Sequence, residues 1–152
     1  MDIGSGNGYP AAALSNFTPR NFIFDGVKCG SLEGPLQSFK FKDVQMQEYV
    51  CTLSGKAAKF KGKNKKWWRT QILYWKGKEY KRDSEEYQQL LNNLYQAAYD
   101  QCENFRKALA ATKGCKLTHS IGKNKIANTI LTENEFCSRL TKLRDYGKLW
   151  GW

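Results

Sequence analysis

Histidine is almost missing from this chain, which has one, His119, in 152 residues. A single histidine excludes a histidine-based metal cluster. A Ser-His-Asp triad would have to use His119, for which the sequence has no serine elbow motif. We therefore expect His119 to be a hydrogen-bonded structural residue and expect neither a metal nor a cofactor. Any catalysis must then depend on Glu, Asp, Lys or Tyr side chains.

Paired cysteines and long apolar runs are also lacking. The five cysteines are an odd number, are widely spaced and include no C-x-x-C pair. This pattern argues against a disulfide framework or a zinc site, so we expect reduced, mostly buried thiols. No run approaches the length of a membrane span, and residues 1–8 have neither a basic nor an apolar signal region. We expect a cytoplasmic protein without membrane contact.

Positive charge is in excess, with 25 Lys and Arg against 14 Asp and Glu, a net charge of +11. A field of this sign favours polyanionic partners. Eleven of the cations lie in segment 56–82, interleaved with aromatic residues. Cations contact phosphate and aromatic rings stack on bases, so this segment predicts nucleic-acid or phosphate binding. The side chains that we expect to contact phosphate are Lys63, Lys65, Lys66 and Arg69. A solvated basic surface is the alternative.

Residue patterns predict two small hairpins and several helices in one domain. Asp25-Gly26 between short apolar runs is typical of a type I′ hairpin, and residues 71–82 look like a second hairpin. We expect helices that begin near Ser31, Asp43 and Ser54. The inner face expected on the second helix carries Met46, Tyr49, Val50 and Leu53, and the short third helix is expected to run through Ala57, Ala58 and Phe60. An uninterrupted helix over about 84–111, with a capping box at Asp83 and Glu86, and a last helix capped by Thr132 and Glu135 complete the set. The fold class is α+β, mainly helical.

The ends of the chain differ in composition from the rest. Residues 1–13 are rich in Gly and Ala without a period, which predicts a flexible N-terminal arm. The folded domain is expected over residues 14–145. The tail, residues 146–152, carries Trp150 and Trp152, which must fold back onto the domain or bind something.

The strongest functional signal lies in residues 31–41. Glu33, Gln37 and Lys40 stand at i, i+4 and i+7, so they share one face of a helix. Leu32, Leu36 and Phe39 repeat this spacing one residue earlier. An apolar stripe beside a polar one predicts a helix at the wall of a cleft. An ordinary amphipathic helix with a polar flank is the alternative.

The order Leu14-Ser15-Asn16-Phe17, then Phe24-Asp25-Gly26, then Ser31-x-Glu33-x-x-x-Gln37-x-x-Lys40-Phe41 resembles the start of the NADAR family, which has the YbiA-like fold. A tryptophan after a basic loop and the closing stretch from Leu140 to Arg144 also fit. The family's Trp-Gly-rich segment is missing, and Cys137 replaces its glycine three residues after Asn134.

This resemblance implies an N-glycosidase that cleaves a ribosyl C1′–N bond. The implied substrates are ADP-ribose attached to guanine, in nucleotide or nucleic acid, or intermediates of the riboflavin pathway. Glu33 would stabilise the oxocarbenium charge or orient the nucleophile, and Lys40 would attack C1′ as an amine. Structural roles remain the alternatives for both, as a first-turn acid and a solvated lysine.

Substrate contacts are implied for Asn16, Phe17, Gln37, Asn134 and either Trp67 or Trp68. A turn with an apolar anchor is the alternative for Asn16 and Phe17, and a core position for each tryptophan. The second function class is a non-catalytic nucleic-acid-binding protein that uses segment 56–82. The sequence leaves the oligomeric state open.

Overall fold

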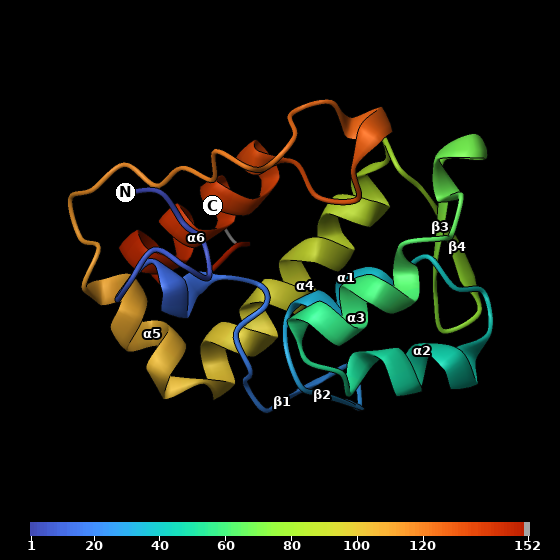
Figure 1. Ribbon diagram of the computed structural model, residues 1–152, viewed down its shortest axis with the longest axis horizontal. Helices are drawn as coiled ribbons and strands as arrows, with labels where there is room; N and C mark the ends of the chain where they lie inside the picture. The colour runs from blue at the N-terminus through green and yellow to red at the C-terminus, as the bar shows by residue number, and fades with distance from the viewer. Residues whose placement is uncertain (151–152) are drawn as a thin grey trace.

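The computed structural model describes residues 1–150, which form one mixed α+β domain of helices and two antiparallel hairpins (Figure 1). This confirms the expected fold class. The strands are β1 (Phe22–Phe24), β2 (Val27–Cys29), β3 (Ile72–Trp75) and β4 (Lys78–Lys81). The α-helices are α1 (Glu33–Ser38), α2 (Val44–Cys51), α3 (Gly55–Gly62), α4 (Glu85–Gln101), α5 (Glu103–Ala110) and α6 (Glu133–Tyr146). Short 3₁₀ turns, η1 to η3, cover Ala12–Leu14, Trp67–Arg69 and Ile126–Asn128.

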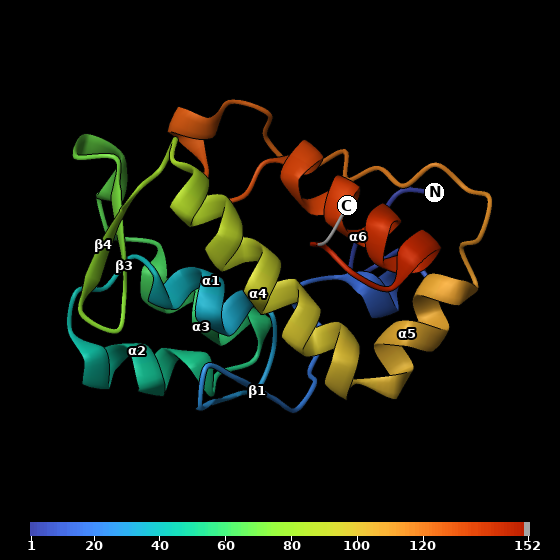
Figure 2. The same ribbon diagram turned by 180° about the vertical axis from the view of Figure 1, so that it is seen from behind.

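Helix α4 crosses the middle of the molecule. Helices α1 to α3 lie on one side of it and α5 and α6 on the other, as both views show (Figures 1 and 2). Its side chains Tyr87, Leu91, Leu94 and Tyr95 are fully buried and hold the two sides together through one core. Burial of side chains of this size stabilises the fold by about 1.5–3 kcal/mol each.

Turn chemistry sets both hairpins. Asp25 and Gly26 have φ of 49° and 80°, and Lys76 and Gly77 have φ of 48° and 85°. Two successive residues with positive φ form the type I′ turn that matches the twist of the paired strands. The pairing of Phe24 with Val27 follows from this turn. Both predicted hairpins are confirmed.

Helix α1 is shorter than the sequence predicts. It begins at Glu33 rather than just after Ser31, whose hydroxyl accepts from the Gly34 amide at 3.1 Å and donates to the Leu53 carbonyl at 2.9 Å. It ends at Ser38, so Lys40 lies beyond it, in a turn where its amide donates to the Gln37 carbonyl at 3.1 Å.

Helices α2 and α3 each turn an aromatic residue outward. Tyr49 is 50% exposed, so its predicted inward position is wrong, and Phe60 on α3 is 70% exposed. Gln47 takes the inner place on α2, because its amide donates to the Tyr74 carbonyl at 2.8 Å and accepts from the Lys76 amide at 3.1 Å. These bonds attach α2 to the second hairpin.

The predicted uninterrupted helix is two helices. Cys102 is extended, with φ −109° and ψ 101°, and separates α4 from α5. The break turns α5 back against α6 and η1, which a straight helix would not reach (Figure 2). The N-cap of α4 is Ser84, which accepts from the Tyr87 amide at 3.2 Å, and not Asp83. The capping box of Thr132 and Glu135 on α6 is confirmed.

Residues 1–13, expected to be flexible, pack against the domain. Ile3 is 1% exposed, and its amide donates to the Thr118 carbonyl at 2.8 Å. Burial of this side chain stabilises the contact between the start of the chain and the segment around Thr118. In the tail, Leu149 is buried and donates to Gln96 at 3.0 Å, while Trp150 is 46% exposed. Trp152, the other tail tryptophan, lies outside the described residues.

All five cysteines are free thiols, and Cys115 alone among them is exposed. Across residues 1–150, no helix has the length and apolar character to cross a bilayer.

Candidate active site

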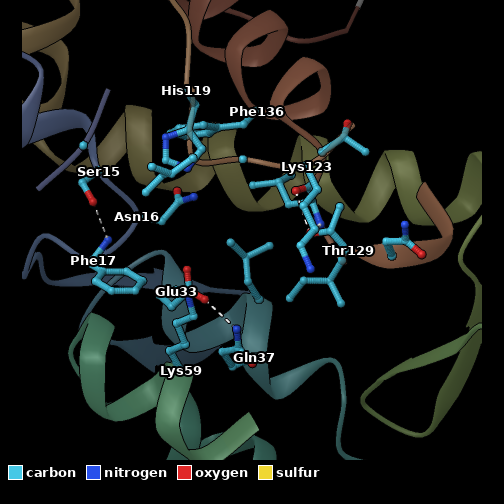
Figure 3. Close-up of a pocket in the computed structure, with 18 of the residues that line it drawn as sticks. Ser15, Asn16, Phe17, Glu33, Gln37, Lys59, His119, Lys123, Thr129 and Phe136 are labelled. Atoms are coloured by element: carbon cyan, nitrogen blue, oxygen red, sulfur yellow. Dashed lines mark hydrogen bonds between the residues drawn. The ribbon is translucent and has the colours of Figure 1, made fainter. Parts of the chain in front are cut away.

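A pocket of about 330 Å³ lies between α1 and α3 on one side and the segment from His119 to Thr132 on the other (Figure 3). Helix α1 contributes Glu33 and Gln37, and the N-terminal segment contributes Asn16 and Phe17. The other lining residues include Lys40, Lys59, Trp67, His119, Lys123, Thr129 and Phe136. The predicted placement of α1 at the wall of a cleft is confirmed.

The Glu33 carboxylate is almost removed from water, at 9% exposure. Its Oε2 accepts from Gln37 Nε2 at 2.6 Å, and its amide donates to the Asn16 carbonyl at 2.9 Å. Burial raises the pKa of Glu33, against the opposing effects of the Gln37 hydrogen bond and the Lys59 and Lys40 charges. A carboxylate that water solvates so poorly interacts strongly with any positive charge placed beside it.

Lys40 is partly buried at the pocket, with its Nζ 3.5 Å from the Gly62 carbonyl. Burial lowers the pKa of Lys40, and the Glu33 charge opposes that shift. The fraction of free amine is therefore larger than for a lysine in water. Glu33, Gln37 and Lys40 do line one pocket, as their spacing predicts, although Lys40 lies outside the helix.

Lys59 is a pocket residue that the sequence analysis did not single out. Its Nζ lies 5.6 Å from the centre of the Phe17 ring. Helix α3 packs this closely because positions 55 and 62 are glycines without a Cβ. A Cβ on Gly55 would lie 2.2 Å from Phe17 Cα, and a Cβ on Gly62 would lie 2.0 Å from Gln37 Oε1. Gly55, Lys59 and Gly62 stand at i, i+4 and i+7, so they share a helix face. This spacing is the sequence signal that could have identified Lys59 as a pocket residue.

The Asn16 side chain is held by Tyr95. The hydroxyl of Tyr95, which is fully buried, donates to Asn16 Oδ1 at 2.7 Å. Because the carbonyl oxygen of the amide is used in this bond, its Nδ2 group remains to donate into the pocket. Figure 3 shows Asn16 between Glu33 and the opposite wall.

The opposite wall contains His119 and Phe136, whose rings meet edge to face with centroids 5.4 Å apart. His119 Nδ1 lies 2.7 Å from the Ile3 carbonyl, which accepts only, so Nδ1 carries the proton. His119 is hydrogen-bonded, as predicted, and it also lines the pocket.

A buried ion pair supports the part of this wall from residue 129 to 132. Arg82 is 1% exposed and donates to both carboxylate oxygens of Glu135, at 2.6 and 3.0 Å. Its Nε donates to the Thr129 carbonyl at 2.8 Å, and the Tyr87 hydroxyl donates to the Ile130 carbonyl at 2.6 Å. Arg82 is therefore a structural cation, although it belongs to the basic segment that was expected to bind phosphate.

The remaining predicted site residues lie in different places. Trp67 lines the pocket and is buried, whereas Trp68 is 52% exposed. The guanidinium carbon of Arg69 lies 5.5 Å from the centre of the Trp68 ring. Asn134 lines a separate cavity of about 260 Å³ with Gln88 and Arg139. The side chains expected to contact phosphate are exposed: Lys63, Lys65, Lys66 and Arg69. None of these four lines the pocket around Glu33.

Comparison with known proteins gives three findings. Residues 8–145 match the model of a family described as bacteriophage protein GP30.3. The chain is 41% identical over 149 residues to an uncharacterized 17.1 kDa protein from the Gp30-rIII intergenic region of Enterobacteria phage T4, covering 95% of this chain and 97% of that protein. The NMR structure of the E. coli protein YbiA superposes with a TM-score of 0.63 at 21% identity, over 95% of this chain and 82% of the other. The expected YbiA-like fold is confirmed.

Proposed function

Since the chain belongs to the bacteriophage protein GP30.3 family and has the fold of YbiA, we propose that it is an N-glycosidase of the NADAR type, which cleaves a ribosyl C1′–N bond. The preferred substrate is ADP-ribose attached to a guanine base, in a nucleotide or in nucleic acid. The observation that carries the proposal is the buried Glu33 carboxylate, which faces a pocket beside Lys40 and Lys59.

Glu33 supplies the electrostatic part of the reaction. When the C1′–N bond breaks, positive charge develops on C1′ and the ring oxygen of the ribose. The burial that raises the pKa of Glu33 also leaves the carboxylate without competing water, so its attraction for this charge is strong. The loss of one preorganised electrostatic contact of this kind slows a reaction by about 100- to 1,000-fold. Gln37 keeps the carboxylate in place by its 2.6 Å hydrogen bond.

Lys40 is the proposed nucleophile. Its free amine forms a bond to C1′ while the C1′–N bond to the base breaks, and the bonding electrons leave with the base, which takes up a proton. A proton then passes from Nζ to O4′ as the C1′–O4′ bond opens, which gives a protonated imine between Nζ and C1′. Water hydrolyses this imine and releases the sugar and the amine. The lowered pKa of Lys40 supports this role, because a protonated amine cannot attack.

Asn16, Phe17 and Trp67 are the proposed contacts to the sugar and the base. The Asn16 amide donates to an acceptor on the ligand, since its own oxygen is occupied by Tyr95. Phe17 and the buried Trp67 offer apolar surface to flat rings.

The decisive experiment measures release of ADP-ribose from ADP-ribosylated guanine in DNA, in RNA and as the free nucleotide, with a riboflavin-pathway intermediate as a further substrate. We expect Glu33→Gln to keep the fold and to lower turnover by roughly 100-fold or more. Glu48→Gln, on the exposed side of α2, is the matched control and should act like the wild type. Wild-type turnover by a folded Glu33→Gln protein contradicts the assignment.

The second candidate function is nucleic-acid binding without catalysis. The observation that favours it is the exposed group of Trp68, Arg69 and three lysines, here called the loop lysines: Lys63, Lys65 and Lys66. Exposed rings beside cations are suited to stacking and phosphate contact. Under this function Glu33→Gln leaves binding unchanged and no substrate releases ADP-ribose. The two functions also combine, if the loop lysines hold a nucleic acid whose modified base enters the pocket.

A further inference from the structure

A second cavity of about 560 Å³ adjoins the pocket around Glu33. The two cavities share Ser5 and Phe17. We call the second one the Tyr9 groove and define it by Ser5, Tyr9, Phe17, Pro19, Ser54 and Lys56, which lie along its walls. It runs between the N-terminal segment and the start of α3.

ADP-ribose attached to a base is too large for the pocket around Glu33 alone. A volume of about 330 Å³ is close to the lower limit of ligand sites, which span roughly 300–1,000 Å³. ADP-ribose on a base comprises two bases, two riboses and two phosphates. If the reacting ribose lies beside Glu33, the far half of such a molecule must lie outside this pocket, and the adjoining groove is larger than the pocket itself.

Each of the two cavities has a lysine of α3 in its wall. Lys59 lines the pocket and Lys56 lines the groove, and both belong to α3. Residues at i and i+3 on a helix are neighbours, with Cβ atoms about 5–6 Å apart. Two cations at this spacing suit the two phosphates of a diphosphate, one beside each lysine.

Beyond the lysines the groove offers an aromatic surface. Tyr9 is 70% exposed, and Pro19 lines the same cavity. An exposed ring next to a phosphate site provides a face on which a base stacks.

We propose that the Tyr9 groove binds the nucleoside-diphosphate part of the substrate. The diphosphate passes Lys59 and Lys56, and the purine stacks on Tyr9. This inference rests on the proposed function for its identification of the reacting ribose. It assigns recognition of the nucleoside-diphosphate part of the substrate to Tyr9 and the lysines of α3 and not to the loop lysines.

The test is calorimetric titration of the whole protein with ADP-ribose, ADP and ribose 5-phosphate. Tyr9→Ala and Lys56→Ala should each weaken the binding of ADP-ribose and of ADP by roughly 5- to 100-fold, as expected for loss of a stacking or phosphate contact. Tyr9→Ala should leave the affinity for ribose 5-phosphate unchanged. Both side chains are exposed, so these variants keep the fold. Tyr49→Ala and Lys42→Ala, which remove an exposed ring and cation elsewhere, should bind like the wild type.

Unchanged ADP-ribose affinity in both groove variants overturns the proposal, as does an equal loss of ribose 5-phosphate by Tyr9→Ala. Failure of the groove and failure of the glycosidase are distinguishable. If the wild type releases ADP-ribose from a base and the groove variants bind normally, the activity stands without the groove. If ADP-ribose binding depends on Tyr9 and no base is released, the groove stands without the activity.

Discussion

Replacing Arg82 by methionine should strongly destabilise the protein. Arg82 is 1% exposed and makes two bonds to Glu135, at 2.6 and 3.0 Å, so its removal leaves a buried carboxylate without its main partner. Breaking a buried ion pair in this way costs about 3–5 kcal/mol of the free energy of unfolding. For a chain of this size each kcal/mol lowers Tm by roughly 2–4 °C, so the expected fall in Tm is about 6–20 °C.

The matched control is the double variant Arg82→Met with Glu135→Gln. It removes both charges of the Arg82–Glu135 pair, and glutamine still serves in the capping box with Thr132, so it should recover part of the lost stability. The recovery is incomplete because the buried Arg139 loses the nearby Glu135 charge. Urea unfolding followed by far-UV circular dichroism measures both. A single variant within about 1 kcal/mol of the wild type, or a double variant less stable than the single one, refutes this reasoning.

The same pair predicts a pH dependence. Burial opposes ionisation of Glu135, but hydrogen bonds from Arg82, the Thr132 amide and Gln88 outweigh it and hold its pKa below the ordinary value. A lowered folded-state pKa contributes stability above the unfolded-state pKa, about 4.3, and that contribution is lost as pH falls through the folded value. In Arg82→Met this acid-dependent part of the unfolding free energy should shrink.

Three further predictions concern the site. Borohydride added during turnover should trap a sugar on Lys40 in the wild type and not in Lys40→Arg; mass spectrometry of the digested protein finds the adduct, and its absence together with substantial turnover by Lys40→Arg makes Lys40 a binding cation only. Changing all three loop lysines to alanine should weaken nucleic-acid binding and reduce the slope of log K against log salt by about 0.7–0.9 per lost contact; an unchanged slope marks a merely solvated surface. Gly62→Ala should lower turnover while the charge of Lys59 is kept. The added Cβ would lie 2.0 Å from Gln37 Oε1 and displace the Gln37 side chain from Glu33; full activity in steady-state assays contradicts this.

Short-range patterns in the sequence predicted much of this fold. The Asp25-Gly26 turn and the Thr132–Glu135 capping box depend on residues within four positions of one another, so the sequence displays them directly. The stripe that begins at Glu33 was also local, and it correctly predicted a pocket lined by Glu33, Gln37 and Lys40.

Other features depend on contacts between distant positions and leave little local trace. Tyr95 binds Asn16 across 79 positions, and Arg82 binds Glu135 across 53. The break at Cys102 has no glycine or proline to mark it, and the apolar helical period continues through it. Its cause is tertiary, the packing of α5 on α6, which overrides the local preference for one long helix.

The residues at the pocket come from nearly both ends of the chain, since Gly4 and Ser5 line it together with Phe136. Asp2 joins them to the opposite wall, because its carboxylate accepts from the Ser120 amide at 2.7 Å and from the Thr118 hydroxyl at 3.0 Å. A ribosome synthesises the N-terminal side of this contact first. The first five residues must therefore wait for more than a hundred others before they find their partners. A nascent or prematurely terminated chain that contains Glu33, Lys40 and Lys59 but stops before His119 still lacks the opposite wall of the pocket, so no such fragment should bind the ligand.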